Sequence, residues 1–217
     1  MRALTWGDLA FLPWAAQWTV VLSALAFVGG GAIGLAIALM RVSERRWLRG
    51  IAAGYIRVVQ GTPLLLQLFL VFFGSDMLGL GLGALVSAAL GLSLNAGAFL
   101  GEIWRGSIQA VAPGQTEAAR ALGLPYGARM LRVVAPQALR LATAPTVGFL
   151  VNLVKSTSLA AVIGFVELTR AGQLLNNATF RPFAVFGSVA AIYFVLCWPL
   201  TVLSRRLERR LSSAYQR

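Results

Sequence analysis

The chain has 217 residues, of which 58% are hydrophobic and 12% charged, with a formal net charge of +12 and a mean hydropathy of +0.76. This composition excludes an ordinary soluble domain and predicts an all-α integral membrane protein. The sequence has no histidine and a single cysteine, Cys197, which excludes a His/Cys metal site, an internal disulfide and a Cys/His catalytic pair. We expect Cys197 to be a small core or lipid-facing residue.

Five apolar runs are candidate membrane spans, because crossing a bilayer takes about 20 apolar residues. We expect spans at about residues 16–40, 58–74, 84–104, 141–165 and 183–203, and a polar loop at 166–182. The first run lacks a small-residue cleavage pattern, so we expect a retained span and not a signal peptide. Together the runs predict one transmembrane domain over residues 1–217.

Small residues recur in the first predicted span, at Gly29, Gly30, Gly31 and Gly34. Such residues let two membrane helices approach closely, so we expect this side of the span to pack against protein. Simple tolerance of glycine in membrane helices is the alternative.

Polar side chains mark three other spans. The second span, with an amphipathic lead-in at 51–59, holds Gln60, Pro63 and Gln67, and its amides serve either interhelical hydrogen bonding or a substrate path. The third contains Asn95 and Glu102. The fourth contains Lys155, Ser156, Thr157 and Ser158 in a row.

Lys155 lies roughly 20 Å along the fourth span from its start near Leu141, which places it near the middle of the membrane. An intramembrane lysine is costly and is a functional candidate by default. The alternative is a structural pairing, with Glu102 or with a partner subunit.

The longest polar interruption covers residues 113–136. Gly123 follows a run of good helix formers and predicts a helix end, Pro125 predicts the start of a second helix, and Pro136 predicts its end. In the second helix, Arg129 and Arg132 form a basic stripe beside an apolar one. Such a helix suits either a membrane surface or a groove in a partner protein.

Basic residues concentrate in alternate connections, as the positive-inside rule requires. Fifteen of the 19 Lys and Arg residues lie in three clusters: Arg41, Arg45, Arg46, Arg49 and Arg57; Arg105, Arg120, Arg129, Arg132 and Arg140; and Arg205, Arg206, Arg209, Arg210 and Arg217. Only Arg2, Arg170 and Arg181 lie in the remaining aqueous segments. We therefore expect the N-terminus outside, and the C-terminus and residues 113–136 in the cytoplasm.

Three features of the sequence carry a resemblance to a known family. Glu117, Ala118, Ala119, Gly123 and Pro136 are spaced as in the EAA signature of ABC-importer permeases, although Val133 and Ala135 stand where that family has larger residues. The run NAGAFLGEIWRGSIQAVAPGQTEAARALG, with QGTPLLLQLF before it, resembles the polar amino-acid permeases. The resemblance implies the five-helix fold of a type I importer permease in the cell inner membrane.

The resemblance also implies partners. Glu117, Ala118, Ala119, Gly123 and Pro136 are expected to contact a dimer of ATP-binding subunits, beside a second permease, identical or related, and an extracytoplasmic solute-binding protein. The sequence shows no phosphate-binding loop, paired carboxylates or activated nucleophile. We therefore expect no enzyme activity and no cofactor in this chain, since the partner subunit binds the ATP.

The expected substrate is a polar amino acid, and the weak preference is for a neutral or acidic one. The candidate contacts are Gln67, Asn95, Lys155, Ser156, Thr157 and Ser158. The alternatives are a permease for another small solute, a stand-alone carrier or channel, and a membrane scaffold. A carrier would be expected to show an internal repeat, and the sequence has no convincing one. A scaffold would not need a lysine deep in the membrane.

Overall fold

The computed structural model describes residues 5–215, so Arg2 and Arg217 of the predicted charge distribution lie outside the described residues. Every regular element in the described range is helical. In chain order they are α1 (Trp6–Val42), α2 (Arg46–Gly61), α3 (Leu64–Met77), α4 (Ala84–Gln109), α5 (Pro113–Ala121), α6 (Tyr126–Arg129), the π-helical turn η1 (Met130–Val134), α7 (Ala135–Ser156), the 3₁₀ segment η2 (Thr157–Ile163), α8 (Leu168–Thr179) and α9 (Pro182–Tyr215). The predicted all-α class is confirmed.

Four helices are long and apolar enough to cross a membrane: Ala10–Val42, Ala84–Gln109, Tyr126–Ile163 and Pro182–Leu211. The fifth candidate is the pair α2 and α3, which is bent by 103°. The predicted span over 58–74 therefore consists of the end of α2 and most of α3, with a sharp bend between them. Pro63 explains the break, because it has no N–H to donate and forces the preceding residue, Thr62, into an extended conformation (φ −115°, ψ 142°).

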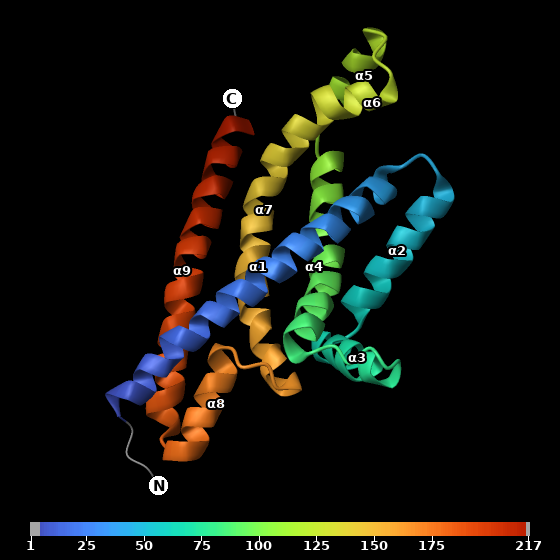
Figure 1. The fold of residues 1–217 in the computed structure, drawn as a ribbon. Coiled ribbons are helices and arrows are strands. Elements are labelled where there is room, and N and C mark those ends of the chain that lie inside the picture. Colours follow the sequence, from blue (N-terminus) through green and yellow to red (C-terminus); the bar gives the residue numbers. More distant parts are fainter. Residues whose placement is uncertain (1–4, 216–217) are drawn as a thin grey trace.

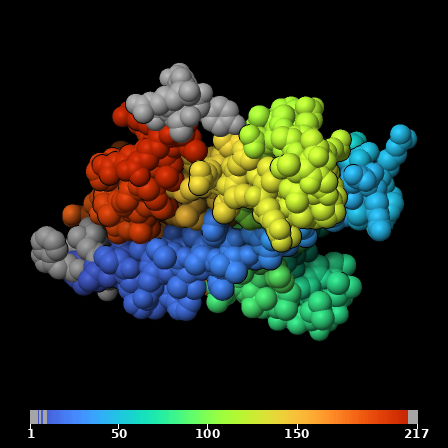
Figure 2. Space-filling view, turned by 90° about the horizontal axis from the view of Figure 1, so that it is seen from above, coloured from blue at the N-terminus to red at the C-terminus, as the bar shows by residue number. Residues whose placement is uncertain are grey.

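The helices form a bundle in which α1 crosses α4 and α7 obliquely, while α9 runs beside α7 (Figure 1). The connection between α1 and α2, the α5 and α6 segment and the C-terminal end of α9 lie at one end of the bundle. The helices α3 and α8 lie at the opposite end. Viewed from the first end, residues 113–136 form an exposed yellow-green surface (Figure 2).

The glycines of α1 pack directly against α4, so the predicted protein packing is confirmed. A Cβ placed on Gly30 would lie 2.5 Å from the Cβ of Ala96, and one on Gly34 would lie 2.9 Å from the Cβ of Leu100. The helix α4 also has a small residue at this contact, because Ile33 of α1 packs over Gly97 of α4. Small residues on both helices therefore bring the two backbones together.

The predicted loop at 166–182 is wrong, because most of it forms α8. Glu167 caps this helix: its Oε2 accepts from the backbone N–H of Thr169 and its Oε1 from that of Arg170, both at 2.9 Å. Sequence polarity predicted a loop, but Leu168, Ala171 and Leu175 recur at helical spacing and are buried against α1 and α9.

Glu167 also joins three helices. Its side chain is fully buried, and Oε2 accepts from the Tyr193 hydroxyl of α9 at 2.9 Å and from the Thr19 hydroxyl of α1 at 3.5 Å. Thr19 Oγ1 in turn accepts from the N–H of Leu168 at 3.2 Å. We call this set of contacts the Glu167 clasp; it fixes α8 between α1 and α9.

The Glu167 clasp should make stability depend on pH. Burial raises the pKa of the Glu167 carboxyl above its ordinary value, and this outweighs the lowering effect of its hydrogen bonds. The folded chain therefore binds this proton more tightly than the unfolded chain, so the contribution to stability is greatest at low pH and is lost as pH rises through the raised pKa. Glu167→Gln should remove that decline. Thermal unfolding in detergent between about pH 4 and pH 8 tests this; parallel pH profiles for wild type and variant would contradict it.

Candidate coupling segment and membrane clefts

Residues 113–136, the coupling segment, begin as two short helices joined by a sharp turn, as predicted. Pro113 occupies the first turn of α5, and Gly123 follows the helix with a left-handed backbone (φ +73°). The N–H of Gly123 donates to the carbonyl of Arg120 at 2.9 Å. Pro125 then precedes α6, in extended conformation.

The EAA-like residues do not all face outward. Glu117, Ala118 and Gly123 are exposed, whereas Ala119 is only 3% exposed. Ala119 therefore packs inside the chain, and its carbonyl accepts from the N–H of Leu124 at 3.1 Å. Glu117, Ala118 and Gly123 form a small exposed patch around the turn, and Pro136, also exposed, lies apart from it in α7.

The second helix does not end at Pro136, which corrects the prediction. The helix α6 continues through η1 into α7, and residues Tyr126–Ile163 form one unbroken helix of 38 residues. Pro136 lies in the first turn of α7, where the hydrogen bonding changes from the π to the α pattern and a missing N–H is tolerated. The helix that ends the coupling segment therefore continues without a break into a membrane span.

A cleft of about 320 Å³ lies between α2, α4 and α7. We call it the amide cleft, because Gln60, Asn95 and Asn152 line it, together with Thr62 and Ser156. The rings of Phe99 and Phe149, stacked with centroids 5.6 Å apart, form an apolar wall. Its lining holds donors and acceptors but no ionisable side chain.

Gln67 does not line this cleft but holds one of its lining residues, Asn95, by a hydrogen bond. Its Oε1 accepts from Asn95 Nδ2 at 3.1 Å, and its Nε2 donates to the carbonyl of Val59 at 2.7 Å and to that of Thr62 at 3.0 Å. Gln67 thus satisfies backbone carbonyls freed by the break at Pro63. Of its two predicted roles, the structure shows interhelical hydrogen bonding.

The four polar residues at the end of α7 do not share one site. Ser156 faces the amide cleft, whereas Lys155 lines a different cleft. Thr157 is fully buried and donates to the carbonyl of Val154 at 2.7 Å, and Ser158 donates to the carbonyl of Lys155 at 2.7 Å. A run of adjacent residues on a helix points in several directions, which explains why the predicted group divides.

Asn152 and the two phenylalanines were missed as candidate site residues. Asn152 precedes Ser156 by four residues, so helical spacing could have placed both on one face. Phe99 and Phe149 face each other only because α4 packs on α7. A short stretch of sequence does not reveal that packing.

The predicted pairing of Lys155 with Glu102 is not formed. Glu102 is ion-paired with Arg105, one turn along α4, through two hydrogen bonds, of which Arg105 Nε to Glu102 Oε2 measures 2.9 Å. Within residues 5–215 the Lys155 ammonium makes no ion pair.

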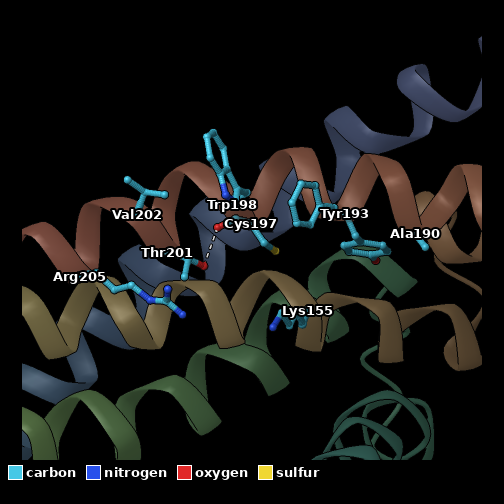
Figure 3. A pocket seen from close by; sticks show the side chains of 9 residues that line it. Lys155, Ala190, Tyr193, Cys197, Trp198, Thr201, Val202 and Arg205 are labelled. Atoms are coloured by element: carbon cyan, nitrogen blue, oxygen red, sulfur yellow. Dashed lines mark hydrogen bonds between the residues drawn. The ribbon is translucent and has the colours of Figure 1, made fainter.

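Lys155 instead lines a second cleft of about 450 Å³ between α7 and α9 (Figure 3). We call it the α7–α9 groove; its polar lining is Lys155, Tyr193, Cys197, Thr201 and Arg205. Cys197 is 6% exposed and packs on Val151 and Val154, so of its two predicted placements it takes the core position.

The apolar helical bundle defines a multi-span membrane protein, and the polar clefts between its spans can hold a small polar solute. Residues 30–213 match the family described as the inner membrane component of binding-protein-dependent transport systems, and the chain belongs to that family. It is therefore a multi-pass inner membrane protein and a transport component.

Several relatives share most of the chain. It is 35% identical over 193 residues to the probable amino-acid ABC transporter permease protein YckA of Bacillus subtilis, covering 89% of this chain and 85% of that one. It is 34% identical over 197 residues to the probable glutamine permease GlnM of the same organism, covering 91% of each. A solved amino acid ABC transporter with histidines is 35% identical, with a TM-score of 0.86 over 97% of this chain and 100% of that chain.

Proposed function

We propose that this chain is the permease subunit of an ATP-driven importer that carries a polar amino acid across the inner membrane. The observation that carries the proposal is the unbroken helix Tyr126–Ile163, which joins the exposed coupling segment to Asn152 and Ser156 of the amide cleft. Movement of the coupling segment is thereby transmitted to the cleft. The names of the relatives favour an amino acid as cargo.

The chemistry of the amide cleft favours a neutral polar amino acid. Its amides and hydroxyls can accept from an ammonium group and donate to a carboxylate, and the phenylalanine pair offers an apolar surface for a side chain. A strongly charged side chain would find no opposite charge in this lining. We therefore assign substrate contact to Asn95, Asn152 and Ser156, with Gln67 holding Asn95 in place.

The orientation we propose has the N-terminus outside and the C-terminus in the cytoplasm. Three basic clusters support it, because the connection after α1, the coupling segment and the end of α9 meet at one end of the bundle (Figure 1). The same arrangement supports one transmembrane domain over the whole chain.

The partners we propose are two ATP-binding subunits, a second permease and an extracytoplasmic binding protein. ATP is bound and hydrolysed by the partner subunits. Glu117, Ala118, Gly123 and Pro136 are exposed and form the docking surface, whereas Ala119 supports it from within.

The test is uptake of radiolabelled amino acids into proteoliposomes that hold the co-expressed complex, with ATP and the binding protein. Asn152→Ala should raise the KM for the transported amino acid roughly tenfold, because it removes a hydrogen-bonding group from the cleft, and should leave basal ATP hydrolysis intact. Thr143→Ala, an exposed polar position on the same helix outside the cleft, is the control. ATP-independent uptake would favour the carrier alternative, and an unchanged KM in Asn152→Ala would exclude the amide cleft.

A further inference from the structure

The α7–α9 groove is separate from the amide cleft, and two basic side chains line it. Lys155 reaches from α7 and Arg205 from α9, and their charged ends point toward one another across the groove (Figure 3). Neither cation makes an ion pair within the described residues, and the groove lining contains no acid. Two converging cations without a counter-charge define a site for an anion.

We propose that the α7–α9 groove binds the phosphate of an anionic phospholipid. Phe194 and Trp198 line the groove beside the two cations, and their rings stack with centroids 6.4 Å apart on its α9 side. Both side chains are more than half exposed. An apolar surface next to a basic site fits an amphiphile with a negative headgroup and an acyl chain.

The two cations lie at different depths along the bundle. Ser204 donates to the carbonyl of Ala144 at 3.1 Å, which places the start of the basic tail of α9 level with that point of α7. Arg205 follows directly, and Lys155 lies 11 residues beyond Ala144, or roughly 16 Å deeper. A phosphate drawn between them occupies the half of the span nearest the coupling segment, and it relieves the cost of a lysine at depth.

We expect no acid of a second copy of this chain to supply the missing anion. Of the seven acids, Glu102 is ion-paired with Arg105 and Glu167 is fully buried in its clasp. The other five lie near helix ends or in connections: Asp8, Glu44, Asp76, Glu117 and Glu208. The nearest along α9, Glu208, accepts from Ser204 at 3.4 Å and makes no ion pair with Arg205.

The experiment measures lipid retention by the intact transporter complex. The complex is reconstituted into nanodiscs of phosphatidylcholine with increasing fractions of phosphatidylglycerol, extracted in mild detergent and analysed for bound lipid by native mass spectrometry. The variants are Arg205→Gln and the double variant Lys155→Gln/Arg205→Gln. Arg206→Gln is the matched control, because it removes the same charge from the next residue, which does not line the groove.

Wild type and Arg206→Gln should retain phosphatidylglycerol in preference to phosphatidylcholine. Each groove cation removed should lower the preference for phosphatidylglycerol over phosphatidylcholine roughly fivefold, so the double variant loses roughly 25-fold. Equal retention in all proteins would overturn the proposal. So would an unchanged lipid preference in the double variant with a raised KM for the amino acid, because that result assigns the two cations to the substrate. If the double variant fails to assemble, the lipid preference of Arg205→Gln alone, compared with that of Arg206→Gln, tests the proposal.

Discussion

Replacing Gly123 by valine should reduce ATP-coupled uptake more than tenfold while leaving the permease in the membrane. Gly123 has φ +73°, a region that costs a residue with a Cβ roughly 1–2 kcal/mol and a β-branched residue more. No atom lies within 4 Å of a Cβ built there, so the cost comes from the backbone and not from crowding. The turn should relax, and the exposed patch around it should lose the shape that the proposed docking requires.

Gly127→Val is the matched control, because Gly127 also has open space around its Cβ position but lies within the helix α6. Gly123→Asn is a second control, since asparagine adopts positive φ more readily, and it should retain most of the activity. Uptake, ATP hydrolysis and co-purification of the ATP-binding subunit measure the effect. Equal losses in Gly123→Val and Gly127→Val would show that bulk, and not the turn, controls docking.

Gly30→Ala should destabilise the bundle itself. The added Cβ would lie 2.5 Å from the Cβ of Ala96 and 3.1 Å from the carbonyl oxygen of Ser93, so α1 and α4 must separate. Overpacking of this kind costs about 1–3 kcal/mol, which corresponds to a Tm lower by roughly 5 °C. Thermal unfolding of the purified protein in detergent measures it.

The neighbouring Gly31→Ala should have little effect, because its Cβ would meet only Trp104, at an ordinary 3.8 Å. The two variants make the same chemical change on the same helix and differ only in the side they face. A similar Tm for both would mean that the interface of α1 and α4 is looser than the structure describes.

Much of the fold could be predicted because its signals are local. Apolar length identified the four straight spans, small residues identified the face of α1 that meets α4, and Gly123 with Pro125 identified the turn. Each of these depends on the chemistry of one short stretch of chain. The break at Pro63 and the course of the helix past Pro136 show the limit: a proline ends one helix and is tolerated in the other, depending on the hydrogen bonding around it.

The clefts were harder to predict because they depend on which helices become neighbours. Sequence polarity grouped Lys155 with Ser156, but α7 presents them to different partners, α9 and the pair α2 and α4. The polar stretch around Glu167 read as a loop because its hydrogen-bond partners, Thr19 and Tyr193, are distant in sequence. Only the packed bundle shows where such groups meet.

The unbroken helix Tyr126–Ile163 has a thermodynamic consequence for the transport cycle. Because one helix continues from the second half of the coupling segment to part of the amide cleft, a change of its tilt alters both together. If closure of the ATP-binding subunits changes the affinity of the cleft for its amino acid by some factor, occupancy of the cleft must change the affinity for ATP by that same factor. Nucleotide titrations with and without the amino acid therefore measure the coupling free energy of the helix directly.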